Sequence, residues 1–249
     1  MKNWPKVVAP LAIGVVFLTL WEVAVRRLGV PSYILPGPLL ILRTLVADWG
    51  SLSISLWVTL EITVMALLAA TVVGCLLAIL FTQSKWIEHS LLPYAVVLQV
   101  TPIVAIAPLI IVWVNDTTLS LLVCAWIVAF FPILSNTVLG LNSADRNLLD
   151  LFKLYGTSRW QTLLFLRLPA SLPYFLAGLR ISGGLSLIGA VVAEFVAGSG
   201  GTGAGLAYQI LLAGLQLNVP RLFASLLLIA LAGVALFVAV VALSRLALG

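Results

Sequence analysis

Long apolar runs separated by short polar stretches dominate this chain. Crossing the hydrocarbon core of a bilayer, roughly 30 Å, takes about 20 consecutive apolar residues. Six runs reach that length, and they cover residues 7–25, 54–81, 90–114, 118–141, 172–197 and 220–246. The pattern therefore predicts an all-α polytopic membrane protein, with about six transmembrane helices in a single domain spanning residues 1–249.

Prolines interrupt two of these runs. Pro93, Pro102 and Pro108 fall inside the third run, and Pro132 falls inside the fourth. Proline removes a backbone donor and clashes with the preceding turn, so we expect the third helix to be kinked or broken and the fourth to be kinked. Irregular backbone is tolerated at membrane depth where it is buried or lines a cavity.

Composition agrees with the apolar pattern and narrows the function. Apolar residues make up 63% of the chain and charged residues only 8%, which excludes an ordinary soluble enzyme and a nucleic-acid binder. Lys and Arg number 13 against 8 Asp and Glu. Most of these Lys and Arg residues lie at the two termini and in the connections that follow the second and fourth runs. Fewer lie in the connections that follow the first, third and fifth runs. The positive-inside rule therefore places both termini in the cytoplasm. A single histidine and two cysteines inside apolar runs provide no metal or redox centre.

Two connections are long enough to hold structure. The first, residues 26–53, predicts an extended proline-rich stretch followed by a short helix near Leu39–Trp49. The second, residues 142–171, places apolar side chains at helical spacing before Gly156, which suits the left-handed end of a helix. Ser158 and Gln161 then have the spacing of a capping box. This connection therefore predicts a helix, a sharp glycine turn and a second helix that ends at Pro169.

The same connection resembles the "EAA" loop of permeases from binding-protein-dependent ABC importers (type I). Asp150, Leu151 and Phe152 fall on the E-A-A positions, Gly156 falls on the glycine, and Leu168-Pro169 falls on the final L-P. Asp replaces Glu, and bulky residues replace both alanines, so the fit to an ATPase groove differs in detail.

Further segments resemble the nitrate, sulfonate and taurine branch of these permeases. "VTPIVAIAPLIIVW" (100–113) is similar to its proline-rich third helix, and "LPYFLAGLRIS" with "GAVVAEFVAG" is similar to its fifth helix. The resemblance implies a bacterial inner-membrane subunit that acts as a homodimer with two cytoplasmic ATPase subunits and an external substrate-binding protein. ATP and Mg would bind those ATPase subunits, and this chain would carry no cofactor and no catalytic site.

By this resemblance the loop contains the coupling helix that meets the ATPase. The residues assigned to that contact are Asp150, Leu151, Phe152, Tyr155, Gly156 and Arg159. The branch implies a small anion as substrate, such as nitrate, a sulfonate, taurine or bicarbonate. Related permeases import pyrimidine or riboflavin-type precursors, which is the alternative.

Several residues in the apolar runs are candidates for a translocation pathway or gate: Pro102, Ala105, Pro108, Arg180, Ser186 and Glu194. An ionisable group at membrane depth costs about 2.5 kcal/mol or more, so Arg180 and Glu194 need a partner or water. They either line the pathway or tie helices together without touching substrate. Small residues spaced by four, Ser182, Ser186 and Ala190, allow close helix packing at a dimer interface or around the pathway.

Two other functions compete with the importer hypothesis. A proton-coupled secondary transporter could use Glu61 or Glu194, whereas an intramembrane enzyme lacks any catalytic constellation. "GSGGTG" (198–203) matches a dinucleotide fingerprint in form only, since an apolar helix precedes it instead of a strand. We expect an outer loop there that meets the binding protein or lines the outer gate.

Overall fold

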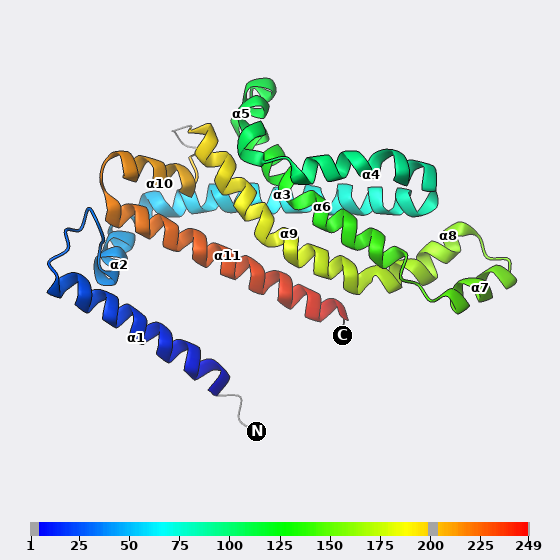
Figure 1. The fold of residues 1–249 in the computed structure, drawn as a ribbon, viewed down its shortest axis with the longest axis horizontal. Coiled ribbons are helices and arrows are strands. Elements are labelled where there is room, and N and C mark those ends of the chain that lie inside the picture. The colour runs from blue at the N-terminus through cyan, green and yellow to red at the C-terminus, as the bar shows by residue number, and fades with distance from the viewer. Residues whose placement is uncertain (1–4, 199–203, 249) are drawn as a thin grey trace.

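The computed structural model describes residues 5–198 and 204–248, and within these ranges every element of regular structure is helical (Figure 1). In chain order the elements are α1 (Pro5–Arg27), α2 (Pro38–Ala47), α3 (Trp49–Gln83), α4 (Lys85–Val100), α5 (Ile103–Val114), α6 (Thr117–Leu141), α7 (Arg146–Leu154), α8 (Arg159–Thr162), a π-helical turn (Leu163–Arg167), α9 (Leu168–Ala197), α10 (Leu206–Leu215) and α11 (Val219–Leu248).

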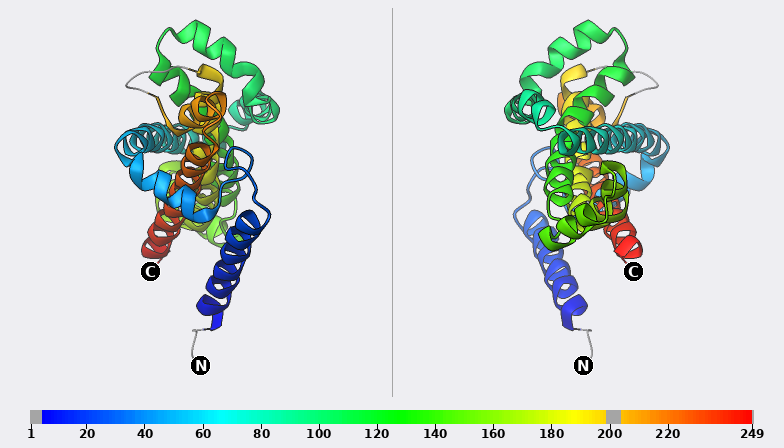
Figure 2. Two further views of the ribbon diagram at one scale, coloured as in Figure 1. Left: turned by 90° about the vertical axis from the view of Figure 1, so that its left-hand side faces the viewer. Right: turned by 90° about the vertical axis from the view of Figure 1, so that its right-hand side faces the viewer.

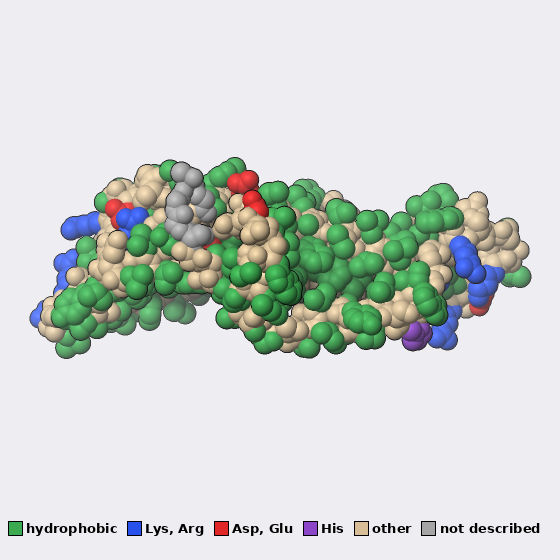
Figure 3. All heavy atoms as spheres, turned by 90° about the horizontal axis from the view of Figure 1, so that it is seen from above, with side chains coloured by type: hydrophobic (Ala, Val, Ile, Leu, Met, Phe, Trp, Pro, Cys, Tyr) green, Lys and Arg blue, Asp and Glu red, His purple; other side chains and the backbone are tan. Residues whose placement is uncertain are grey.

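Five helical segments in the described ranges are long and apolar enough to cross a membrane. They are α1, α3, α6, the continuous run from α8 to α9, and α11. A sixth crossing is possible if α4 and α5, which meet at an angle of 103°, count as one broken span. One face of the molecule shows a broad apolar middle, with Lys and Arg gathered toward its two ends (Figure 3). The predicted class, an all-α polytopic membrane protein, is confirmed.

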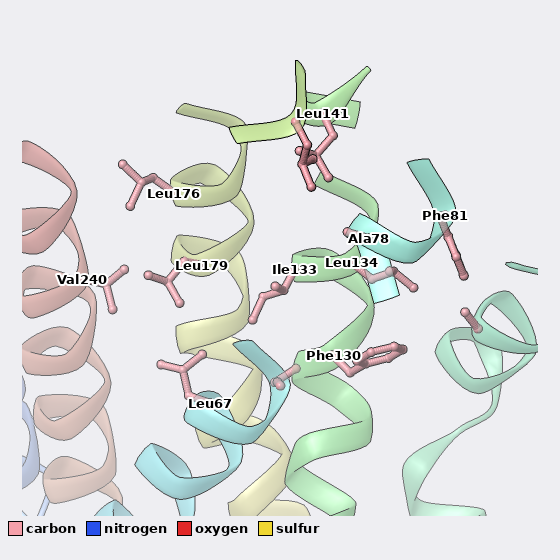
Figure 4. Close-up of a cluster of buried hydrophobic side chains, with 14 residues drawn as sticks. Leu67, Ala78, Phe81, Phe130, Ile133, Leu134, Leu141, Leu176, Leu179 and Val240 are labelled. Atoms are coloured by element: carbon pink, nitrogen blue, oxygen red, sulfur yellow. The ribbon is translucent and has the colours of Figure 1, made fainter. Parts of the chain in front are cut away.

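The centre of the bundle is formed by α3, α6 and α9, with α11 packed along α9 (Figure 1). The largest apolar cluster lies mainly between these helices, and the members labelled in Figure 4 belong to α3, α6, α9 and α11. Phe81 from α3, Ile133 and Leu134 from α6, and Leu176 from α9 are almost completely buried there. The helices that hold this core therefore come from distant parts of the sequence.

Small residues allow α6 and α9 to approach closely. A Cβ at Gly178 would lie 2.7 Å from the carbonyl oxygen of Pro132, and a Cβ at Gly189 would lie 2.8 Å from the Cα of Ala125. Between these positions the Ser182 hydroxyl donates a 2.6 Å hydrogen bond to the Ala129 carbonyl. The stripe of small residues on α9 thus packs against α6 of the same chain.

Two ten-residue helices, α2 and α10, lie at one end of the bundle, and the α7–α8 segment lies at the other (Figure 1). A small apolar cluster joins α2 and α10 to the beginnings of α3 and α11, through Ile41, Leu206, Leu52 and Ala224. The short helix predicted near Leu39–Trp49 is present as α2. The next helix begins directly afterwards, at Trp49, and is longer than the predicted second span.

Helix α1 diverges from the bundle toward its N-terminal end (Figures 1 and 2). None of its apolar window is buried in this chain. Its C-terminal part is held by Trp21, whose ring makes edge contacts with Phe17 and with Phe223 of α11. The rest of α1 is available to lipid or to another subunit.

The predicted end of the second loop helix at Pro169 is wrong. The helical run continues from Arg159 to Ala197, because a π-helical turn at Leu163–Arg167 precedes the proline. The wider hydrogen-bond register of a π turn leaves room where a proline ring would clash with a regular α-helical turn. The same run passes Pro173 without a break. The fourth predicted span forms one continuous helix that contains Pro132, and the kink predicted there stays a prediction.

Candidate functional site

The segment between α6 and α9 forms a compact elbow, which we define as α7, the turn at Gly156, and α8. Asp145 is the N-cap of helix α7, and its carboxylate accepts a 2.8 Å hydrogen bond from the backbone N–H of Asn147. The helix ends at Leu154 with Tyr155 as its C-cap, and Gly156 follows with φ +67°. Left-handed backbone of this kind favours glycine, so the predicted glycine turn is confirmed.

Side-chain hydrogen bonds fix the second half of the elbow. The Ser158 hydroxyl accepts from the N–H of Gln161, while the Gln161 side chain accepts from the N–H of Ser158 at 2.7 Å. This is the predicted capping box. The Thr157 hydroxyl also donates to the carbonyl of Phe152 at 2.9 Å, across the turn. The angle between α7 and α8 is therefore held by several local bonds.

The elbow presents apolar side chains that the rest of the chain does not cover. No residue of α7 is buried, and Leu154 and Tyr155 are 85% and 79% exposed. Leu151 is exposed as well, whereas Phe152 is half-buried. Exposed apolar patches rimmed by polar residues mark interaction sites. Asp150 lies beside them, paired with Lys153 at 2.7 Å on the surface.

A polar cleft of about 390 Å³ separates the elbow from the end of α3. Arg159, the last predicted coupling residue, lines it together with Thr82, Gln83, Leu149, Lys153, Thr157, Thr162 and Arg167. All six predicted coupling residues thus lie on or next to one elbow at one end of the bundle.

The predicted pathway residues do not gather in one place. Pro102 lies in the sharp break between α4 and α5 as the N-cap of α5, which confirms that the third apolar run is broken. It lines a cavity of about 350 Å³, together with residues of α4, α6 and α9. Ala105 and Pro108 are exposed along α5.

The three candidates on α9 have different surroundings. Arg180 is exposed, on the same side of α9 as Gly184 and Ile188. Ser186 is fully buried and its hydroxyl donates to the carbonyl of Gly183. Glu194 is buried near the far end of α9.

Hydrogen bonds take up both oxygens of Glu194. One accepts from the Thr59 hydroxyl of α3 at 2.8 Å, and the other accepts from the backbone N–H of Ala207 in α10 at 2.9 Å. Thr59 in turn accepts a 2.9 Å hydrogen bond from the N–H of Leu206. The carboxylate therefore joins three helices. The "GSGGTG" run, which follows α9 in the sequence, lies, apart from Gly198, outside the described residues.

Comparison with known proteins identifies the family of this chain. The family described as "Binding-protein-dependent transport system inner membrane component" matches residues 70–248. The chain belongs to this family of ABC importer permeases. Proteins of this family are transport subunits that work with an ABC ATPase and a substrate-binding protein, and ATP hydrolysis takes place on the separate ATPase subunit.

Curated relatives match the permease over most of its length. The formylaminopyrimidine transport permease protein ThiX of Halalkalibacterium halodurans is 32% identical over 96% of this chain and 94% of its own. The riboflavin transport system permease protein RibX of Chloroflexus aurantiacus is 34% identical over 98% and 90%. A putative aliphatic sulfonates transport permease protein, SsuC of Bacillus subtilis, is 30% identical over 90% and 80%. These relatives are named for different substrates.

Sequence reasoning missed two residues of the Glu194 group. Thr59 is one of several hydroxyl residues within an apolar run, and it lies 135 positions from Glu194 in the chain. Gly205 is followed by an apolar helix, yet its role depends on the carboxylate that packs against it. The only available signal was that a carboxylate at membrane depth needs a donor, which does not say where the donor lies.

Proposed function

We propose that this permease forms the translocation pathway of an ABC importer and that its elbow receives force from the ATPase. One observation carries the proposal: an exposed apolar elbow, fixed internally by a capping box and a left-handed glycine, continues without a break into the central helix α9. A rigid segment joined to a core helix can transmit displacement at its surface into the membrane. The exposed side chains of Leu154 and Tyr155 would provide the apolar surface that contacts the ATPase.

Connectivity supports the orientation of this arrangement. If α1 and α11 each cross the bilayer, the beginning of α1, the end of α11 and the elbow all lie on the same side of it (Figure 1). That side carries Lys85, Arg146, Lys153, Arg159 and Arg167. The positive-inside rule makes it cytoplasmic, so we place both termini and the elbow in the cytoplasm of the inner membrane.

Replacing Leu154 by Glu tests ATPase docking. Leu154 is 85% exposed, so the change leaves the fold intact but puts a charge into the proposed apolar contact. We expect at least tenfold less ATPase to co-purify with the Leu154→Glu permease. Leu215→Glu is the matched control, since Leu215 is 77% exposed at the opposite end of the bundle. Equal loss in both variants, or no loss in either, contradicts the proposal.

A second copy of the permease completes the pathway in this proposal. The exposed side of α9 that contains Arg180, together with the exposed residues of α5, has no cover within the chain. A homodimer would bring two such faces together around a central passage. Pro102, Ala105 and Pro108 would line one wall, while Ser186 would remain in the packing behind it.

For the substrate we favour a heteroaromatic precursor of the pyrimidine or flavin type. The relatives named for formylaminopyrimidine and riboflavin transport each cover at least nine-tenths of both chains. A small anion is the second candidate. It is favoured by Arg180, which is exposed on α9 and, among the described residues, forms no ion pair.

Uptake into proteoliposomes distinguishes these substrates and also tests the secondary-transport alternative. The vesicles would contain the permease, its ATPase and the binding protein, with labelled pyrimidine precursor, riboflavin, taurine or nitrate outside. We expect uptake of a heteroaromatic compound that requires internal ATP and persists with a proton ionophore. Uptake of taurine or nitrate alone would favour the small-anion candidate. Uptake without ATP that collapses with the ionophore would refute the importer.

A further inference from the structure

Glu194 is the only charged residue that is buried in the described part of the chain, with 2% of its surface exposed. It lies near the end of α9 that faces away from the elbow (Figure 1). A buried carboxylate at membrane depth must be stabilised by donors. Here the donors are the Thr59 hydroxyl and the first turn of α10.

The contact with α10 is a helix cap supplied from a distance. The first N–H groups of a helix have no partner inside it, and the same end carries partial positive charge. Glu194 accepts from Ala207, and Thr59 accepts from Leu206, so these two side chains satisfy the first two donors of α10. Neither residue belongs to α10, and the cap therefore ties it to α9 and α3.

Gly205 makes this cap possible. It is the N-cap residue of α10, and a Cβ placed on it would overlap the Glu194 carboxylate. Its backbone has negative φ, so glycine is required by the close approach and not by the conformation. Gly214, in the same helix, has room for a Cβ, whose nearest contact would be 3.8 Å away on Leu222.

A glutamate from a neighbouring helix also caps α2, but its side chain is more exposed than that of Glu194. Glu22, near the end of α1, accepts a 3.1 Å hydrogen bond from the N–H of Leu39 in α2. Gly37 is the N-cap of α2, and a Cβ there would lie 2.6 Å from the Glu22 carboxylate. Arg26 also binds Glu22, whose side chain is 17% exposed. Only the Glu194 cap recruits a third helix.

Helix α9 connects this cap to the elbow. The run from Arg159 to Ala197 contains 39 helical residues, which at 1.5 Å each extends about 58 Å. Displacement of the elbow would therefore reach α10 through the last turn of α9, where Glu194 lies.

We propose that Glu194 is a positioning residue for transport, which makes α10 move with α9 and α3, and that it neither contacts substrate nor carries a proton. This inference rests on the proposed function for the source of the movement. The cap requires a side chain that accepts from Ala207 and satisfies Thr59. Glutamine can do both, since its amide oxygen accepts from Ala207 and its amide group donates to Thr59. The Thr59 hydroxyl can then donate to the carbonyl of Ser55, which lies 3.2 Å away.

The experiment compares Glu194→Gln, Glu194→Ala, Gly205→Ala and Gly214→Ala in the purified complex of permease, ATPase and binding protein. Two quantities are measured: amide hydrogen exchange in the first turn of α10, and substrate uptake set against basal ATP hydrolysis. We expect Glu194→Gln and the control Gly214→Ala to remain within twofold of the wild type in both. Glu194→Ala and Gly205→Ala should exchange at least tenfold faster at Leu206–Gln209 and lose at least tenfold in uptake, with basal hydrolysis within twofold.

Two outcomes overturn the proposal. One is loss of uptake in Glu194→Gln with α10 still protected, which would assign chemistry to the carboxylate. The other is unchanged exchange and uptake in Glu194→Ala. If the alanine variants fail to assemble, Thr59→Val provides a milder test, because it removes the hydroxyl at nearly constant volume and should speed exchange at Leu206 about threefold or more. A wild-type complex without ATP hydrolysis would contradict the proposed function instead, and the exchange measurements would still test the cap.

Discussion

Replacing Gly156 by Val is expected to uncouple ATP hydrolysis from transport. The residue has φ +67°, which a β-branched side chain adopts only at a cost of about 1–3 kcal/mol. No atom lies within 4 Å of a Cβ built there, so the effect comes from backbone strain that changes the angle of the elbow. In reconstituted vesicles we expect at least tenfold less stimulation of ATP hydrolysis by the loaded binding protein, with normal membrane insertion.

Gly156→Asn provides the matched control. Asparagine tolerates left-handed backbone far better than valine does, so this variant should keep most of the stimulation. Wild-type stimulation in Gly156→Val vesicles would refute the role assigned to the turn. Equal loss in both variants would mean that the position tolerates no side chain, and that the contact surface matters more than the turn.

Replacing Gly189 by Ala is expected to destabilise the bundle. A Cβ at this position would lie 2.8 Å from the Cα of Ala125, a backbone atom that cannot move without shifting α6. Overpacking of this kind costs about 1–3 kcal/mol, which corresponds to a Tm lowered by roughly 2–12 °C for a chain of this size. Thermal unfolding of the detergent-purified permease measures the change.

Gly184→Ala on the same helix is the control for that substitution. A Cβ at Gly184 meets no atom within 4 Å in the chain, so its Tm should stay close to that of the wild type. If both variants lower Tm equally, contacts with a second subunit explain the loss, and the close approach of α6 and α9 does not, since alanine has a higher helix propensity than glycine.

Local rules predicted the elbow well because its causes are local. The positive φ of Gly156 and the capping box of Ser158 and Gln161 depend on residues within a few positions of one another. Prolines in the third run likewise predicted the break near Pro102. Pro169 was misinterpreted as a helix end because nothing in the sequence indicated the π turn before it, which depends on how α9 enters the bundle.

Contacts between residues far apart in the chain could not be predicted from the sequence, because they do not depend on neighbouring residues. The small residues of α9 predicted close packing, but only the folded chain shows that the partner is α6 and not a second subunit. Glu194 was recognised as a buried charge in need of donors, and its donors come from α3 and α10. Apolar periodicity carries no information about which helix a polar group will face.

The sequence by itself determined that this protein is a helical membrane protein with a glycine elbow, because the length of each apolar run and the chemistry of each turn are properties of neighbouring residues. The resemblance of its loop motif added the permease family. The tertiary structure alone decided which helices touch, that α9 continues unbroken from the elbow, and that Glu194 caps α10. Those features depend on side chains far apart in the chain, whose meeting is set by the packing of the whole bundle and not by any local preference.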